Sequence, residues 1–320
     1  MRVLILGLSS IARRRVLPAL ARLAGVDAVD IASRGKSAPE SWDKKGRFFA
    51  DYDEAVAASD AELVYVSLPN RDHAAWIGAA LAAGRHVIVD KPATLTLGEA
   101  RACVGEASRR SLLLAEATVF SYHSQVDAMR RFVEEHGPLT HVDAQFVIPP
   151  LPPENFRNHR RLGGGCLNDM GPYAAAVARL FGNGVPTGLC AFAAPPDPDR
   201  DIDMGFTFAA SFESGMRMTG HFSFESEYQN RLSLIARGGS LAVERVFSPP
   251  PDLPPVWQVR RASRAAEESQ PADDAFQAFL GAALDAIAAG RHQAHYDDLL
   301  SDAAFRARIA SALGYGEEEE

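Results

Sequence analysis

The first 118 residues of this 320-residue chain alternate apolar runs with helical patterns, and this alternation constrains the fold more than any other feature. Residues 2–7 form one apolar run, as in a buried parallel strand, and a helical pattern over 11–23 follows. The same alternation continues, with strands expected at 29–32, 63–68, 86–89 and 112–115, and helices at 52–58, 72–83 and 97–108. It predicts a doubly wound parallel sheet whose ligand lies at the carboxyl ends of the strands.

After about residue 120 the pattern changes to longer strands with short turns. Helices are expected at 125–135, 166–181 and 273–289, and strands at 141–148, 187–193, 205–213, 216–225, 229–236 and 240–246. Consecutive strands joined by short turns indicate an open, largely antiparallel sheet in an α+β domain. We therefore expect an N-terminal Rossmann domain at 1–118 and a substrate or oligomerisation domain at 119–272. Residues 273–320 are expected to form helices that pack back on the first domain, followed by an acidic tail.

Composition excludes several classes of protein. Hydrophobic residues make up 47% of the chain and charged residues 23%, which excludes a disordered chain or a fibre. The net charge of -8 argues against a dedicated nucleic-acid binder, and no apolar run approaches the roughly 18 residues of a membrane helix. The three cysteines show no metal-ligand spacing, and their odd number is typical of reduced thiols. We expect a cytoplasmic protein with no metal site and no nucleic-acid or membrane partner.

The turn after the first strand is a candidate phosphate-binding loop. A dinucleotide pyrophosphate binds there, on backbone N–H groups at a helix N-terminus. The usual pattern is G-x-G-x-x-G, and this chain has Gly7, Ser9 and Ala12 at the three glycine positions. Ser9 keeps the loop small and offers a hydroxyl donor. Gly7, Ser9, Ser10 and Ile11 are therefore expected to bind the cofactor.

The end of the second strand predicts which cofactor is bound. NAD-binding proteins place an acid there for the ribose 2′-hydroxyl, whereas NADP-binding proteins use an arginine. Here the strand leads into Ser33-Arg34-Gly35-Lys36, and the nearest acid, Asp30, lies inside the strand. A hydroxyl and a guanidinium suit a 2′-phosphate. Ser33 and Arg34 therefore favour NADP(H) over NAD(H).

A lysine follows the strand expected at 86–89, at the edge of the sheet where ligands bind. The chain has only four lysines against 29 arginines, and Lys91 is one of them. Pro92 biases Lys91 toward an extended backbone, which directs its side chain away from a helix. Beside a nicotinamide, Lys91 could hydrogen-bond a substrate oxygen whose charge changes during hydride transfer.

Three stretches carry a family resemblance. Residues 67–73 read Ser-Leu-Pro-Asn-Arg-Asp-His, and residues 80–92 read Ala-Leu-Ala-Ala-Gly-Arg-His-Val-Ile-Val-Asp-Lys-Pro. Residues 163–173 read Gly-Gly-Gly-Cys-Leu-Asn-Asp-Met-Gly-Pro-Tyr. Together they resemble the glucose–fructose oxidoreductase / inositol dehydrogenase (Gfo/Idh/MocA) family of nicotinamide-dependent sugar and cyclitol oxidoreductases. The resemblance covers most of the chain and is thin after residue 185.

The resemblance implies roles for single residues. The family residue that matches Tyr173 moves the proton, and a nearby Lys91 cation would lower the pKa of a phenol, which ordinarily ionises near about pH 10. Asp169, on the same helical face as Tyr173, would orient the substrate or the lysine. The cofactor would contact Leu68, Pro69, Asn70, His73, Asp90, Lys91 and Arg157, and the substrate Lys91, His123, Asp169 and Tyr173. His73 could equally cap its helix, and Phe156 stands where the family often has tryptophan before the arginine.

These features predict an NADP(H)-dependent oxidoreductase that moves hydride between nicotinamide and a sugar ring carbon, with a nucleotide-linked keto sugar as one candidate substrate. One alternative is an inositol, aldose or trans-dihydrodiol dehydrogenase. Another is a non-catalytic sensor that binds cofactor or sugar, although such family members tend to lose the lysine or the helical acid–base residue. By family analogy we expect a homodimer or homotetramer.

Overall fold

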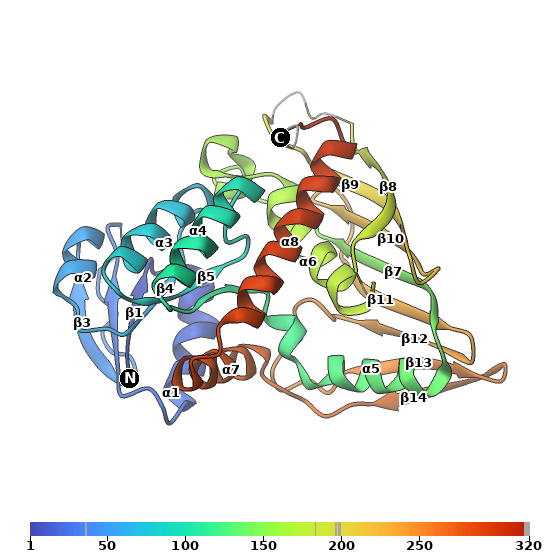
Figure 1. Cartoon of the computed structure of the whole chain (residues 1–320), viewed down its shortest axis with the longest axis horizontal. Coiled ribbons are helices and arrows are strands. Elements are labelled where there is room, and N and C mark those ends of the chain that lie inside the picture. The colour runs from blue at the N-terminus through green and yellow to red at the C-terminus, as the bar shows by residue number, and fades with distance from the viewer. Residues whose placement is uncertain (36, 183, 196, 198–199, 317–320) are drawn as a thin grey trace. The chain divides into compact units, whose positions relative to one another are not determined.

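The computed structural model of the protein describes residues 1–35, 37–182, 184–195, 197 and 200–316, and it divides into two compact units (Figure 1). Unit 1 comprises residues 1–117 and 276–300, and unit 2 comprises residues 118–275 and the described residues from 301 on. Lys36, part of the basic turn in the sequence, lies outside the described residues.

Unit 1 contains a six-stranded, all-parallel sheet in the order β3-β2-β1-β4-β5-β6, which confirms the predicted Rossmann fold. Its strands are β1 (Arg2–Leu6), β2 (Ala28–Ala32), β3 (Lys45–Phe49), β4 (Leu63–Val66), β5 (His86–Asp90) and β6 (Leu114–Ala117). This order reverses between β1 and β4, and in such sheets ligands bind beside the reversal, at the carboxyl ends of the strands. The edge strand β3 was not expected, because its Lys-Gly-Arg-Phe-Phe sequence has no apolar run and only its last residue is buried.

The helices of unit 1 follow the predicted positions closely. They are α1 (Leu17–Arg22), α2 (Tyr52–Ala58), α3 (His73–Ala82), α4 (Leu97–Arg109) and α7 (Ala275–Ala289), with short helices η1 (Ala12–Val16) and η2 (Asn70–Asp72). Asp51 caps α2 as expected, since one carboxylate oxygen accepts from the N–H groups of Asp53 and Glu54 at 2.9 and 3.0 Å. The first helix differs from the prediction, because residues 12–16 form a π-helical turn before α1.

Unit 2 contains an eight-stranded sheet in the order β14-β13-β12-β11-β7-β10-β9-β8. Its strands are β7 (Leu139–Val147), β8 (Pro186–Ala193), β9 (Gly205–Phe212), β10 (Arg217–Ser223), β11 (Gln229–Ala236), β12 (Gly239–Glu244), β13 (Val256–Arg261) and β14 (Arg264–Ser269). Every pair of neighbours is antiparallel except β7 and β10, which confirms the largely antiparallel sheet. The β13–β14 hairpin was missed because β14 is exposed along most of its length.

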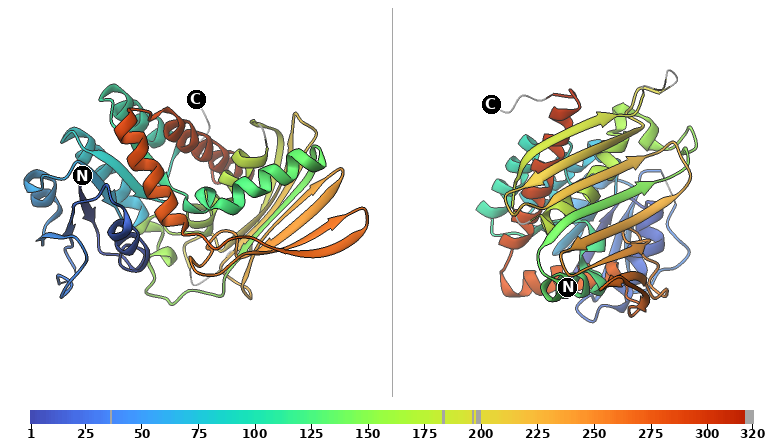
Figure 2. Two further views of the ribbon diagram at one scale, coloured as in Figure 1. Left: turned by 90° about the horizontal axis from the view of Figure 1, so that it is seen from below. Right: turned by 90° about the vertical axis from the view of Figure 1, so that its right-hand side faces the viewer.

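The helices of unit 2 bury one face of this sheet. They are α5 (Ser124–His136), α6 (Cys166–Phe181) and α8 (Gln293–Ala312, whose first turns belong to unit 1), with short helices η3 (Val119–Tyr122), η4 (Phe156–Asn158) and η5 (Arg160–Leu162). Side chains of α5 and α6 share one core with alternate residues of the strands. The right-hand view of Figure 2 shows the opposite face of the sheet, which no described helix covers. Period-two alternation places polar groups there, such as Thr219, whose hydroxyl donates to Asp143 at 2.6 Å.

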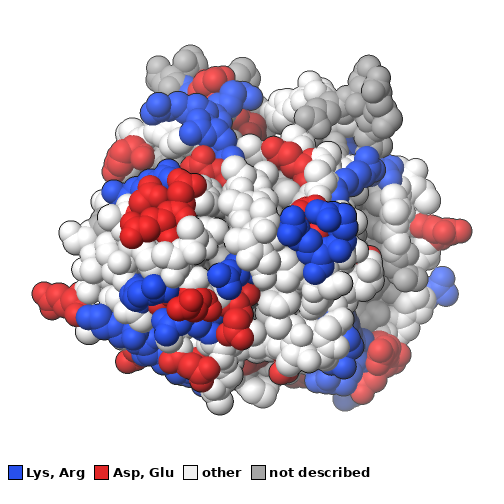
Figure 3. All heavy atoms as spheres, turned by 60° about the vertical axis from the view of Figure 1, so that its left-hand side comes forward, with Lys and Arg blue, Asp and Glu red and all other residues white. Residues whose placement is uncertain are grey.

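The surface charge and the apolarity of the helices concern which partners the protein could bind. Basic and acidic side chains are interspersed on the face shown in Figure 3, so that face has no field of a single sign. Among the helices of the described chain, none combines the length and the apolarity needed to cross a bilayer.

Three histidines of unit 1 give this fold a pH dependence. The rings of His86 and His292 lie 5.6 Å apart, and His295 follows within the first turn of α8. Burial lowers the pKa of all three, and the proximity of His292 further lowers the pKa of His86 and His295. His86 Nδ1 also accepts a hydrogen bond from the Leu113 N–H at 2.9 Å, which a protonated ring cannot do. The folded state therefore favours neutral rings, and their contribution to stability is lost as pH falls through the ordinary histidine range.

We predict that H86N loses less thermal stability than wild type when pH falls from about 7.5 to about 5, because the variant has one fewer group to protonate. The asparagine oxygen can still accept from the Leu113 N–H. The measurement is the unfolding midpoint against pH, with H221N as the control because the His221 side chain is exposed on β10. Equal pH dependence in H86N and wild type would contradict the account.

Candidate functional site

The loop between β1 and η1 has the form of a phosphate cradle. Gly7 has φ +93°, and a Cβ placed there would lie 2.2 Å from the carbonyl oxygen of Ser67. Only glycine therefore allows the loop to approach the end of β4 so closely. Ser10 and Ile11 are exposed just before η1. Together, the left-handed glycine, the exposed loop and the helix start fit a dinucleotide pyrophosphate bound on backbone N–H groups.

The Ser9 hydroxyl belongs to a network inside the protein. Tyr65 and Ser67 donate to the two carboxylate oxygens of Asp90 at 2.7 and 2.5 Å. Because the Ser67 proton is used there, the Ser9 hydroxyl must donate to Ser67 across their 2.7 Å contact, while it accepts from the Ala12 N–H at 3.0 Å. We expected this hydroxyl to be a donor to the cofactor, but its proton is directed toward β4. The loop therefore offers the cofactor backbone N–H groups.

The end of β2 carries the two residues that were expected to select the cofactor. Ser33 is buried, and its N–H donates to the Phe49 carbonyl. The Arg34 guanidinium lies over the rings of Tyr52 and Trp76, at 4.6 and 5.5 Å from their centroids. It also pairs with Asp51 at 3.4 Å and Asp53 at 3.0 Å, yet its side chain remains half exposed. Arg34 is thus a cation that these contacts fix in position, half exposed, just after the carboxyl end of β2.

Asp30, the nearest acid, is occupied inside the protein. It is fully buried, and one oxygen accepts from Arg2 Nη1 and the Arg47 N–H, both at 2.8 Å. The other oxygen accepts from the Ser59 hydroxyl at 2.7 Å. A carboxylate so fully engaged is not available to a ribose hydroxyl, which agrees with the reasoning from the sequence.

The loop after β5 is held on both sides of Lys91. The peptide bond between Lys91 and Pro92 is cis. The Ala93 N–H donates to Glu116 of β6 at 2.6 Å. His73 is buried, and its ring nitrogens lie 2.7 Å from the Pro92 carbonyl oxygen and 2.9 Å from that of Leu68. His73 therefore joins the Lys91 loop to the β4 loop, which also contains Pro69 and the buried Asn70.

In unit 2, α6 carries the expected acid and tyrosine. Asp169 lies in the first turn, and its carboxylate pairs with Arg157 Nε at 2.8 Å. The Arg157 guanidinium also lies over the Phe156 ring at 4.7 Å, so phenylalanine serves as a stacking surface where the family often has tryptophan. Arg157, expected at the cofactor, is thus directly bound to Asp169.

Three phenylalanine rings surround Tyr173. The ring centroids of Phe120, Phe146 and Phe247 lie 5.9, 5.1 and 5.3 Å from that of Tyr173, in tilted or edge-on arrangements. Such pairs restrict ring orientation. The tyrosine is only half buried, so the cage fixes the ring without enclosing the whole side chain.

The two ring nitrogens of His123 lie in different surroundings. Its Nδ1 accepts from the Gln125 N–H at 3.1 Å and so caps α5. That bond assigns the proton to Nε2, which is buried and has no hydrogen-bond partner among the described residues. Burial lowers the pKa of this histidine, which favours the neutral ring. The contact between His123 and the substrate stays a prediction, because this nitrogen has no exposed surface in the structure.

Several of these residues were missed from the sequence. Glu116, Tyr65 and Ser67 act through partners on neighbouring strands, and the three phenylalanines come from distant segments. One signal for Glu116 was present in the sequence: it is a charged residue in the otherwise apolar strand β6, and a buried charge there needs a partner.

Two family descriptions match this chain over most of its length. Residues 1–118 match the oxidoreductase family with an NAD-binding Rossmann fold, and residues 126–242 match the GFO/IDH/MocA C-terminal domain. The chain belongs to the Gfo/Idh/MocA family of oxidoreductases. Membership confirms the resemblance carried by the two motifs of unit 1 and the glycine-rich motif of unit 2.

Relatives in this Gfo/Idh/MocA family include enzymes of deoxysugar chemistry. The chain is 35% identical over 279 residues to a dTDP-3,4-didehydro-2,6-dideoxy-α-D-glucose 3-reductase of Saccharopolyspora spinosa, covering 85% of this chain and 83% of that protein. It is 31% identical over 325 residues to the enzyme of the same name from Actinomadura kijaniata, covering 98% and 95%. A solved structure of a 3-ketoreductase from Actinomadura kijaniata, in complex with NADP and TDP-benzene, has a TM-score of 0.89 at 30% identity and covers 98% of each chain.

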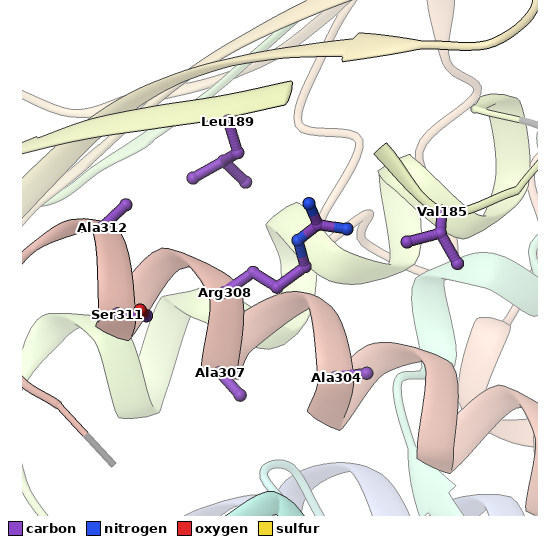
Figure 4. Close-up of a pocket in the computed structure, with 7 residues that line it drawn as sticks. All are labelled: Val185, Leu189, Ala304, Ala307, Arg308, Ser311 and Ala312. Atoms are coloured by element: carbon purple, nitrogen blue, oxygen red, sulfur yellow. The ribbon is translucent and has the colours of Figure 1, made fainter. Parts of the chain in front are cut away.

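A separate hollow of about 550 Å³ lies in unit 2 between β8 and α8. Figure 4 shows the Arg308 side chain there among small and apolar side chains. The residues that line it are Val185, Leu189, Ala304, Ala307, Arg308, Ser311 and Ala312. None of the expected site residues is among them, so this hollow is not the candidate site.

We predict that G7A weakens NADPH binding at least about tenfold, because a left-handed alanine is strained and its Cβ would meet the Ser67 carbonyl. G84A is the matched control, since Gly84 also has positive φ but has nothing within 4 Å of an added Cβ. Cofactor fluorescence titration and the unfolding midpoint report the two effects. Equal losses of NADPH affinity in G7A and G84A would show that the loop is not a cradle.

Proposed function

We propose that this protein is an NADPH-dependent reductase of a keto group on a nucleotide-linked sugar. One observation carries the proposal: α6 presents Tyr173 in a cage of three phenylalanine rings, in a chain that also has Lys91 at the end of a Rossmann strand. The similarity to NADP-bound 3-ketoreductase structures over 98% of the chain supports the choice of a keto sugar.

The roles follow from the chemistry of each group. The nicotinamide cofactor supplies the hydride that reduces the carbonyl carbon. The Lys91 ammonium donates a hydrogen bond to the carbonyl oxygen, which stabilises negative charge as it develops. Tyr173 gives its phenolic proton to that oxygen, so that hydride and proton together convert the ketone to an alcohol. Asp169, held by Arg157, orients a substrate hydroxyl, and the His123 Nε2–H is a further donor to the sugar.

The cofactor is proposed to be NADP(H). The loop around Gly7, Ser9, Ser10 and Ile11 would take the pyrophosphate, with Asn70 and the Leu68–Pro69 backbone beside it. The 2′-phosphate would lie against the buried Ser33 and the stacked Arg34 cation. One observation supports this choice over NAD(H): Asp30 is fully hydrogen-bonded elsewhere, so it is not available to a ribose 2′-hydroxyl.

A substrate diphosphate needs cations in unit 2, where acidic residues are in excess. Three arginines lie close in sequence before the glycine run. Arg157 is bound to Asp169 and Arg160 to Asp201, whereas the exposed Arg161 has no ion-pair partner in the described part of the chain. We assign Arg161 to the diphosphate.

The alternatives are weaker. An inositol, aldose or trans-dihydrodiol dehydrogenase would use the same Lys91 and Tyr173, but the similarities above favour a keto sugar. A sensor would not need both residues. A cytoplasmic homodimer or homotetramer remains part of the proposal, and the sheet face without a covering helix in Figure 2 is a candidate surface for a second copy.

We predict that Y173F and K91A each lower kcat for keto-sugar reduction at least about a hundredfold, the scale of general acid–base catalysis. Both variants should keep the wild-type unfolding midpoint. Y228F and K45A, which change an exposed tyrosine and an exposed lysine, are the controls and should retain wild-type kcat. Turnover near the wild-type rate in either Y173F or K91A would refute the assigned role.

We also predict that R34A raises the Kd for NADPH at least about tenfold and changes the Kd for NADH less than about threefold, because only NADPH carries the 2′-phosphate. R109A, on the exposed face of α4, should change neither value. Parallel losses of affinity for both cofactors in R34A would contradict phosphate recognition by this arginine.

A further inference from the structure

The first turn of α6 takes its cap from a distant segment. The N-terminal N–H groups of a helix need acceptors, and a polar side chain at the N-cap ordinarily supplies one. Here the N-cap is Gly165, which has no side chain. The Cys166 N–H donates to the carbonyl oxygen of Asp203 at 2.9 Å, and the Leu167 N–H donates to Asp203 Oδ2 at 2.6 Å. One residue just before β9 thus satisfies two N–H groups at the helix start.

Gly165 and Asp203 are matched in space. Gly165 has φ +112°, and a Cβ on it would lie 2.2 Å from Asp203 Oδ1. The glycine therefore leaves the volume that the carboxylate occupies. A Cβ on its neighbour Gly164 would lie 2.3 Å from the Arg157 carbonyl oxygen, which accepts from the Gly165 N–H at 2.9 Å. Arg157 and Asp203 together fix the place where α6 begins.

The buried position of the Asp203 carboxyl disfavours its ionised form. Burial raises its pKa to about 6, although the Leu167 N–H and the nearby Arg160 favour the ionised form. Tyr315 also lies close enough for its ionised form to interact unfavourably with the Asp203 carboxylate. A buried carboxyl is retained where its acceptor function is needed, since burial without donors would destabilise the fold.

The helix start determines where the reacting groups lie. The Asp169 N–H donates to the Gly165 carbonyl at 3.1 Å, so Asp169 is one turn from the cap, and Tyr173 follows one turn later. We propose that Asp203 is a positioning residue, which places Asp169 and Tyr173 by capping α6 from outside the helix. This inference rests on the proposed function. A displacement of about 1 Å at a reacting group can cost about a hundredfold in rate.

The test compares D203A, D203N and wild type in keto-sugar reduction at saturating NADPH. We expect D203A to lower kcat at least about tenfold with KM and NADPH affinity changed less than about twofold. D203N should recover kcat to within about threefold, because the amide oxygen can accept from the Leu167 N–H. D201A is the matched control, since Asp201 is exposed two residues away and should leave kcat unchanged.

Other outcomes overturn the proposal. A folded D203A with wild-type kcat, or a D203N as slow as D203A, would show that the cap acceptor does not place the catalytic groups. If D203A does not fold, D203E takes its place in the test, because glutamate retains the charge but displaces the carboxylate. Wild-type kcat in D203E would also contradict the proposal. Hydrogen exchange at residues 166–169 needs no turnover: it should be faster in D203A or D203E than in wild type and D203N, and unchanged exchange would refute the cap. A wild type that reduces no keto sugar contradicts the proposed function alone.

Discussion

The Asp90 carboxylate is the interaction on which the cofactor half of this protein depends. Tyr65 and Ser67 donate to its two oxygens, and Ser9 of the phosphate loop donates to Ser67. Burial raises the pKa of Tyr65 well above its usual range, so this phenol stays protonated and remains a donor. Because Lys91 follows Asp90 directly, one network joins the phosphate loop, the end of β4 and the strand that presents the lysine. Loss of the Tyr65 or the Ser67 hydroxyl would remove one of these two hydrogen bonds from a partly buried carboxylate.

In unit 2, as in unit 1, a glycine lets another segment come close to the backbone, and a polar group then fixes the loop. Glycine at 164 and 165 lets backbone and carboxylate groups approach to distances that a side chain would prevent. The anchors are the Arg157 carbonyl and Asp203, and Arg157 in addition holds Asp169 through its guanidinium. In both units, therefore, a glycine-containing turn precedes the helix that carries or binds the reacting groups.

The sequence was informative wherever a local pattern determined the structure. Apolar runs located five of the six strands of unit 1, Asp51 was recognised as a helix cap, and the motifs around Lys91 and Tyr173 led to the family. Edge strands β3 and β14 were missed because exposed strands need no apolar pattern. The partners of Asp90, the Tyr173 cage and Asp203 were missed because each depends on contacts between distant segments. The expectation that the Ser9 hydroxyl donates to the cofactor was wrong for the same reason. Its proton is directed by Ser67 and Asp90, which lie 58 and more residues away in the sequence.

The central claim is that hydride from NADPH is delivered to a ring carbon of a nucleotide-linked keto sugar. The most direct measurement uses NADPH deuterated at C4 of the nicotinamide, with the product analysed by NMR and mass spectrometry. The account predicts stereospecific transfer of one deuterium to the former carbonyl carbon, with the hydroxyl proton coming from solvent-exchangeable Tyr173. Tight NADPH binding with no deuterium in any sugar product, from an enzyme whose fold and cofactor loops are intact, would contradict it.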